Sequence, residues 1–118
     1  MENWEKLVAL KSLWVQRGSV LRVPTKLTND PDWYPDPWTD FLIFDSKANG
    51  AYGLIVLSGH KAGMISVVFP AESSLPGHVG LRREWLIENW NKWVYPNGSA
   101  EEVWIRNPEI QVSSVEFL

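Results

Sequence analysis

Two histidines and a run of aspartates are the residues of this 118-residue chain whose types suit acid–base or metal chemistry. His60 and His78 each stand beside a glycine, and no second titratable group lies at a spacing that defines a mechanism. The chain also lacks a Gly-x-Ser-x-Gly motif, a His-x-x-x-His motif and a phosphate-binding glycine loop. We interpret His60 as a turn residue and assign no catalytic residues. The open alternative is a small enzyme or ligand-binding domain using His60, Asp40 and a tryptophan-rich loop.

Acidic charge is concentrated in one segment. Residues 27–46 contain five aspartates and no lysine or arginine, a local charge of −5, whereas nine glutamates and eleven basic residues give the rest of the chain +2. Carboxylates accelerate encounter with a basic partner, and aromatic rings supply buried anchors. We therefore predict a protein-binding surface from the acidic and aromatic residues of this segment. They are Asp30, Asp32, Trp33, Tyr34, Asp36, Trp38 and Asp40.

Two other interpretations of the same segment stay open. The aspartates can cap proline turns while Trp33 and Trp38 pack back onto the core. Asp30 and Asp32 also have the spacing that begins a calcium-binding EF-hand loop, but the glycine and the distal glutamate of that motif are missing. We expect no metal and no cofactor.

Composition limits the partners and the location. The absence of cysteine excludes disulfides, a thiol nucleophile and thiolate metal sites. A pI of about 5.3, with Arg82-Arg83 as the one basic cluster, argues against nucleic-acid binding. The acidic start and the short apolar runs predict neither a signal peptide nor a membrane span, and hence a cytoplasmic protein. A tryptophan platform also suits a sugar, but the missing secretion signal counts against that partner.

The positions of prolines, glycines and apolar runs in the sequence predict the loop and strands that must position these residues. Pro31, Pro35 and Pro37 exclude a regular element, so residues 25–40 are expected to form a long loop. Residues 13–24 suggest a hairpin around Arg17-Gly18, and Asn49-Gly50 predicts a turn. Further apolar runs predict strands at 41–45, 52–58, 64–69 and 103–106. The strand within 52–58 is expected to be central and covered on both faces. Residues 1–13 suit a short helix or the approach to a strand, and 110–118 an edge strand or a tail.

One helix is predicted over Leu81–Val94, where apolar residues recur every three or four positions. The fold class is therefore α+β: a mostly antiparallel sheet of five or six strands with this helix, at about 81–94, packed on one face. We expect residues 1–118 to form a single domain.

The eight tryptophans divide by position. Those of the helix and of the predicted strands are expected in the core or at its margin, namely Trp14, Trp85, Trp90, Trp93 and Trp104. Trp33 and Trp38 lie in the acidic loop and are expected to meet a partner. Trp4 is not assigned.

Two segments resemble a family of small bacterial immunity proteins, family forty-five of the polymorphic-toxin systems. The first runs from Leu57 through the Lys-Ala-Gly turn at 61–63 to Val67-Val68-Phe69-Pro70, and the second is the tryptophan-rich stretch 84–96 ending in Trp-Val-Tyr-Pro. The similarity extends over about residues 13–106. One departure is the helix start, Gly80-Leu81-Arg82-Arg83, where a serine or threonine cap is expected.

The resemblance implies a protein that binds and neutralises a cognate bacterial toxin and is not an enzyme. Members are thought to be encoded beside the toxin, a contact-dependent or type VI secreted effector, with a nuclease among the candidates. The resemblance identifies no catalytic residues in this chain, and it does not indicate the oligomeric state. The implied partner is the toxin itself, with no nucleic acid and no membrane.

Overall fold

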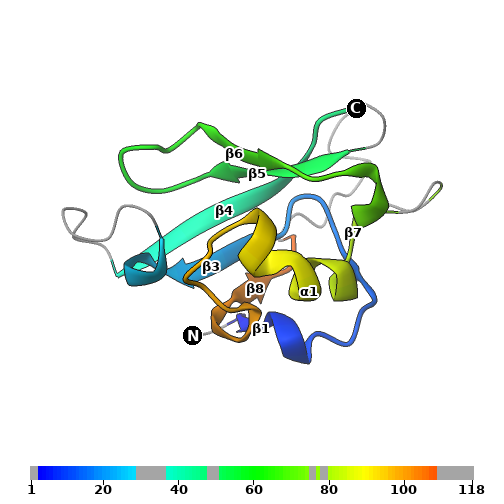
Figure 1. The fold of residues 1–118 in the computed structure, drawn as a ribbon, viewed down its shortest axis with the longest axis horizontal. Helices are drawn as coiled ribbons and strands as arrows, with labels where there is room; N and C mark the ends of the chain where they lie inside the picture. Colours follow the sequence, from blue (N-terminus) through cyan, green and yellow to red (C-terminus); the bar gives the residue numbers. More distant parts are fainter. Residues whose placement is uncertain (1–2, 29–36, 48–50, 75–76, 78–79, 109–118) are drawn as a thin grey trace, which may run out of the picture.

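The computed structural model describes residues 3–28, 37–47, 51–74, 77 and 80–108. Its main sheet has six antiparallel strands in the order β1-β8-β3-β4-β5-β6 (Figure 1). The strands are β1 (Glu5–Lys6), β8 (Trp104–Arg106), β3 (Val20–Pro24), β4 (Trp38–Asp45), β5 (Tyr52–Val56) and β6 (Ile65–Val68). A second sheet pairs β2 (Trp14–Val15) with β7 (Leu81–Arg82). The helices are α1 (Arg83–Trp93) and four 3-10 turns, η1 (Leu7–Ala9), η2 (Thr25–Leu27), η3 (Ala71–Ser73) and η4 (Ala100–Glu102).

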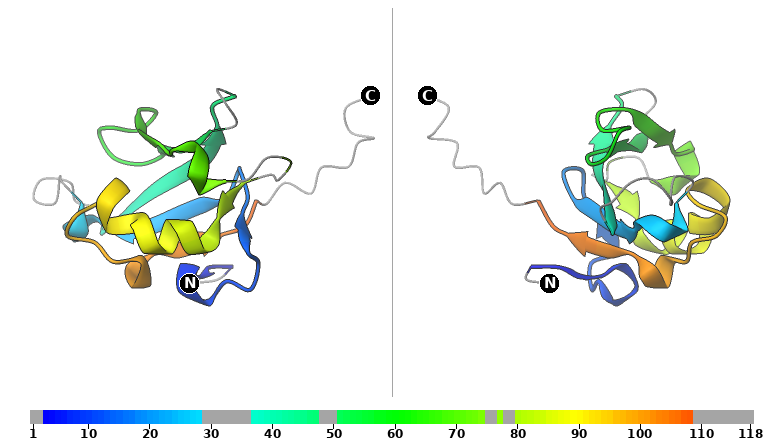
Figure 2. Two further views of the ribbon diagram at one scale, coloured as in Figure 1. Left: turned by 45° about the vertical axis from the view of Figure 1, so that its right-hand side comes forward. Right: turned by 90° about the vertical axis from the view of Figure 1, so that its left-hand side faces the viewer.

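The predicted α+β class is confirmed. The helix α1 lies on one side of the main sheet (Figure 2). The strand β8 is inserted between β1 and β3, so residues near both ends of the described chain are neighbours in the sheet.

The core fills the space between α1 and the facing side of the sheet. Trp85, Leu86 and Trp90 of α1 are buried against alternate residues of the strands, as expected for an amphipathic helix on a pleated surface. Phe69 joins them through edge-on ring contacts, with centroids 5.6 Å from Trp85 and 6.5 Å from Trp93. The sheet contributes Leu21, Val23, Phe41, Ile43, Tyr52, Leu54, Val56 and Ile105.

The helix begins two residues later than predicted, because Leu81–Arg82 form β7 instead of a first helical turn. Arg82 occupies the N-cap position and provides no side-chain cap. The Arg83 N–H donates to the Leu13 carbonyl oxygen at 2.9 Å. The Leu13 carbonyl thus accepts from one of the helix-start N–H groups that have no partner within the helix.

The predicted hairpin over residues 13–24 is wrong. β2 pairs with β7, while β3 pairs with β4 and β8. The Gly18 N–H donates to the Ile43 carbonyl oxygen at 2.7 Å, so the glycine turn is attached to β4. Because β3 has five residues and pairs with β4 on one side and β8 on the other, it gains more ladder hydrogen bonds than a local hairpin would provide.

Other boundaries shift modestly. β4 begins at Trp38, inside the segment predicted as loop, and residues 1–13 contain β1 and η1 instead of a regular helix. β5 pairs on both sides, but it lies next to the edge strand, and Ile55 is only half-buried on the side away from α1. The Asn49-Gly50 turn, His78 and residues 110–118 lie outside the described residues.

A search of the described helices for a membrane span finds none with the required length and apolarity.

A candidate protein-binding face

Most of the predicted binding surface lies outside the described residues, namely Asp30, Asp32, Trp33, Tyr34 and Asp36. Trp38 and Asp40 are described and stand at the start of β4. The structure therefore locates one end of the acidic segment on the main sheet.

Alternation along β4 decides which way these two side chains point. Thr39, Phe41 and Ile43 are buried toward α1, whereas Trp38 and Asp40 are half-buried and point to the opposite side. We call that side of the main sheet the helix-free face. Trp38 therefore does not pack back into the core under α1.

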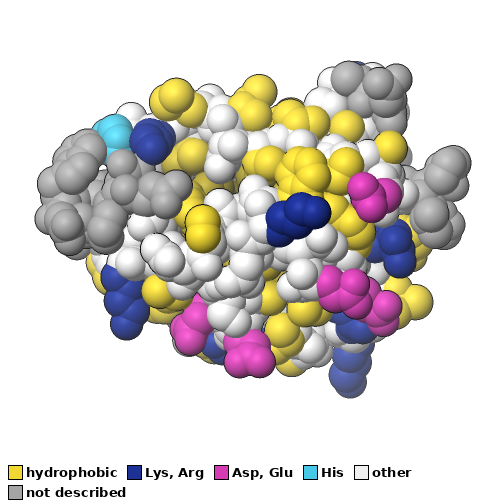
Figure 3. Space-filling view, in the orientation of Figure 1, with side chains coloured by type: hydrophobic (Ala, Val, Ile, Leu, Met, Phe, Trp, Pro, Cys, Tyr) yellow, Lys and Arg dark blue, Asp and Glu magenta, His cyan; other side chains and the backbone are white. Residues whose placement is uncertain are grey.

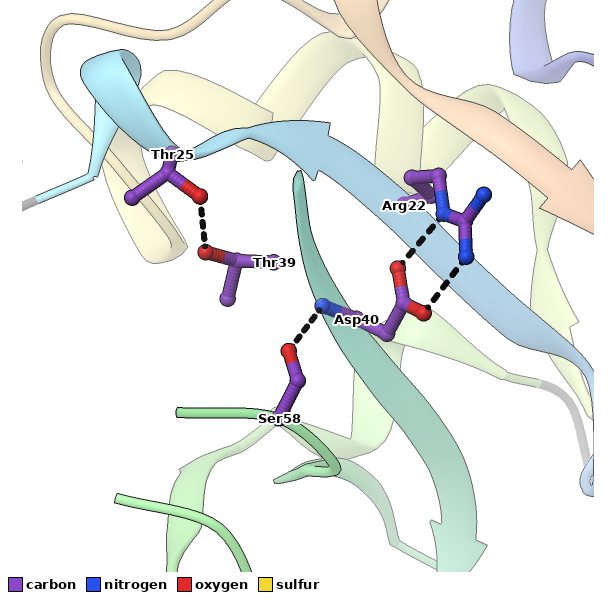
Figure 4. Close-up of polar contacts among 5 residues, drawn as sticks. All are labelled: Arg22, Thr25, Thr39, Asp40 and Ser58. Carbon is purple, nitrogen blue, oxygen red and sulfur yellow. Dashed lines mark hydrogen bonds and ion pairs between the residues drawn. The ribbon is translucent and has the colours of Figure 1, made fainter. Parts of the chain in front are cut away.

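Asp40 is held on the helix-free face by a two-pronged ion pair with Arg22 of β3. The Arg22 Nε and Nη2 donate to the two carboxylate oxygens at 2.8 and 2.9 Å (Figure 4). The side chains keep 25 % and 20 % of their surface exposed, so the pair lies at the boundary with solvent. The planar fork of arginine matches a carboxylate in this way, which fixes the direction of both groups.

The backbone of β4 is tied to its neighbours at the same place. The Asp40 N–H donates to the Ser58 hydroxyl at 3.1 Å, and the hydroxyls of Thr25 and Thr39 lie 2.8 Å apart (Figure 4). These contacts hold the backbone at the start of β4, where the acidic segment enters the main sheet.

Arg22 is also the centre of an aromatic cluster. Its guanidinium carbon lies 4.2 Å from the Trp4 ring centroid and 6.0 Å from that of Trp38. The guanidinium carbon of Arg106 also lies over the Trp4 ring, 4.9 Å from its centroid. Cation–π contacts of this kind are attractive and hold flexible side chains in place.

The strand register explains why these residues meet. Lys6, Trp104, Arg22 and Asp40 form one row across β1, β8, β3 and β4. Directly opposed residues point to the same side of a sheet, so the row lies on the helix-free face. The Lys6 ammonium lies 4.6 Å from the Trp104 ring. Trp104 was expected at the core margin, and its position on this face corrects that expectation.

This composition is typical of protein interfaces. Tryptophan and arginine are the residues that most often contribute large binding energies, because they bury much area and also donate hydrogen bonds. Here the tryptophan and arginine side chains already hold one another in place, so binding a partner would cost little side-chain conformational entropy. The helix-free face can therefore act as a preorganised aromatic and cationic surface.

The His60 alternative gains no support from the geometry. His60 is exposed in a turn and borders a small hollow together with Thr39. The hollow holds about 30 Å³, far below the roughly 300–1,000 Å³ of a typical ligand pocket. The Asp40 carboxylate is bound to Arg22 on the opposite side of the sheet from Thr39, so the two proposed acid–base groups are not brought together. Among the described residues, no three His, Asp or Glu side chains gather as a metal site.

Sequence reasoning did not assign Trp4, Arg22 and Arg106 to a site. The one signal was the alternation in Trp104-Ile105-Arg106. Ile105 is buried, so Trp104 and Arg106, whose side chains both carry N–H donors, lie on the opposite side of the strand. β8 and β3 are far apart in the sequence, so no local sequence pattern indicates that they pair or in which register.

A protein-family model described as Imm45, immunity protein 45, matches residues 2–105 of the chain. No curated protein and no solved structure matches the chain. The matched span includes every residue of the helix-free face named above except Arg106.

Proposed function

The chain belongs to the immunity protein 45 family, and from that premise we propose that it neutralises a cognate bacterial toxin by binding over its active or substrate-binding surface. The toxin would be a contact-dependent or type VI secreted effector, met in the cytoplasm of the cell that makes this protein. The family match is the observation that carries this proposal.

The acidic segment, with Trp38 and Asp40 where it reaches the helix-free face, is the surface that we assign to the toxin. Trp38 and Asp40 belong both to the segment and to the helix-free face. Toxin domains that act on nucleic acid present basic clefts. In such a cleft, the carboxylates of Asp30, Asp32 and Asp36 would take the place of phosphates, and tryptophan rings the place of bases.

Association kinetics test the role of the segment. Replacing Asp30, Asp32 and Asp36 by Asn should slow association with the purified toxin and flatten its dependence on salt, because long-range attraction is lost. The matched control replaces the exposed Glu84, Glu88 and Glu101 by Gln, which removes the same charge elsewhere. Equal effects from both triple variants, or no effect from the aspartate variant, would remove the segment from the interface.

Stoichiometry tests the mechanism. A protein that blocks by occupying a surface should abolish toxin activity at one molar equivalent and fail to protect against an excess. Titration of toxin activity with this protein would show an end point at equivalence. Continued loss of toxin activity at substoichiometric amounts would instead indicate catalysis.

A further inference from the structure

The two edges of the main sheet differ in how well they are protected. β1 is two residues long and both residues are charged, Glu5 and Lys6, which is how natural sheets discourage further pairing. β6 at the other edge has four residues, none of them charged, and among the described strands it pairs only with β5. Such an edge is a template for another strand.

Exposed apolar side chains gather at this edge. Six large hydrophobic residues are exposed in the described part of the chain, and four of them lie on β6 or beside it. They are Leu57 (44 %), Met64 (58 %), Ile65 (59 %) and Val68 (43 %). Figure 3 shows hydrophobic side chains along the upper margin of the molecule, where β5 and β6 run in Figure 1. Clustered apolar exposure of this kind marks an interaction site.

Backbone hydrogen bonds identify the groups that face outward. The Phe69 N–H donates to the Tyr52 carbonyl at 2.8 Å, and the Val56 N–H donates to the Met64 carbonyl at 2.9 Å. Successive residues of a regular strand turn their amides to opposite edges. Val68 adjoins Phe69 and Ile65 adjoins Met64, and the register shift between them, opposite Leu54 and Ile55, adds one residue to β6. Val68 and Ile65 therefore both direct their N–H and C=O groups to the free edge.

We propose that a second copy of this chain pairs with β6 in antiparallel fashion, with Ile65 of each copy opposite Val68 of the other. The contact is two-fold symmetric, since both copies contribute the same edge. In this contact, the outward-facing N–H and C=O groups of the two copies hydrogen-bond to one another, and the exposed apolar side chains become covered. After two copies have paired, the edges of the main sheet that remain among the described strands are the charged β1 strands, so the assembly closes as a dimer.

Charge favours a second copy as the occupant. Lys61 lies in the turn before β6, Glu72 lies in η3 after β6, and both are exposed. In the two-fold arrangement, the turn of one copy and η3 of the other stand at the same end of the paired strands, so each end combines a lysine with a glutamate. Opposite charges at both ends set the register and the antiparallel direction. This inference concerns self-association and does not depend on the toxin.

Sedimentation velocity of the wild-type chain over a range of concentrations should show a monomer–dimer equilibrium. The double variant Ile65→Lys with Val68→Lys places four like charges in the contact and should weaken dimerisation by at least about tenfold. The matching variant with Glu at both positions should do the same. A mixture of the lysine and glutamate variants should recover a dimer containing one chain of each.

The control is Leu13→Lys, at a residue 62 % exposed beside β2, which should leave the dimer intact. Thermal unfolding of each variant verifies that the chains are folded. A wild type that stays monomeric at every concentration overturns the proposal, as does a mixture that fails to associate. A monomer whose toxin binding is abolished by the lysine variant, but not by Leu13→Lys, would assign the edge to a strand of the toxin instead.

Discussion

At the scale of single residues, Arg22 connects the two kinds of chemistry on the helix-free face. Its guanidinium binds the Asp40 carboxylate with two hydrogen bonds and also contacts the rings of Trp4 and Trp38. Each contact uses a different part of the same group, the edge for the carboxylate and the flat side for the rings. Lysine has no equivalent geometry, so it cannot make both contacts in the same way.

The ion pair should contribute about 1 kcal/mol to folding stability, because both side chains remain partly exposed. We expect Asp40→Asn and Arg22→Lys each to lower the free energy of unfolding by about 1 kcal/mol. The double variant should lose less than the sum, since either change alone already breaks the paired geometry. Urea denaturation of the four proteins provides the test, and strictly additive losses would contradict a direct coupling.

Glycine at position 80 is required by the way the chain enters β7. Gly80 has a φ of +125°, and a Cβ placed there would lie 2.3 Å from the Val15 carbonyl oxygen. Gly63 also has a positive φ, +90°, but an added Cβ would meet nothing within 4 Å. We expect Gly63→Ala to cost about 1 kcal/mol and Gly80→Ala clearly more, because the second change adds a backbone clash. Equal losses in urea denaturation would show that the chain next to β2 can move aside.

At the scale of elements, α1 is held by its tryptophans. Trp90 is 1 % exposed and Trp85 is 7 % exposed, while Trp93 is half-buried and contacts Phe69 and Trp85. Replacing Trp90 by Ala should lower the free energy of unfolding by about 3–5 kcal/mol, through lost burial and the cavity left behind. Trp93→Ala should cost less.

Chemical denaturation together with toxin binding separates the two possible roles of these rings. A core ring changes stability and leaves the intrinsic toxin affinity of the folded protein unchanged. If Trp85→Ala weakened toxin binding without any loss of stability, the ring would instead belong to the interface.

At the scale of the whole molecule, sequence reasoning succeeded where a pattern is local. The α1 stripe, the strands and the α+β class follow from periodicity within a few residues. The hairpin prediction failed because β2 takes β7 as its partner, more than sixty residues away. The aromatic cluster was missed for the same reason, since Trp4, Arg22, Trp38 and Arg106 meet only through the register of four strands. The role of the acidic segment, residues 27–46, in binding a partner stays a prediction.

The position of β8 also constrains how the protein forms during synthesis. This strand is among the last described segments of the chain, yet it lies between the first strand and β3. A nascent chain that has not yet produced residues 104–106 leaves β1 without a partner and one edge of β3 unpaired. Closing such distant contacts is slow compared with forming local ones. A chain that ends before residue 104 is therefore expected to lack the strand that joins β1 to the rest of the main sheet.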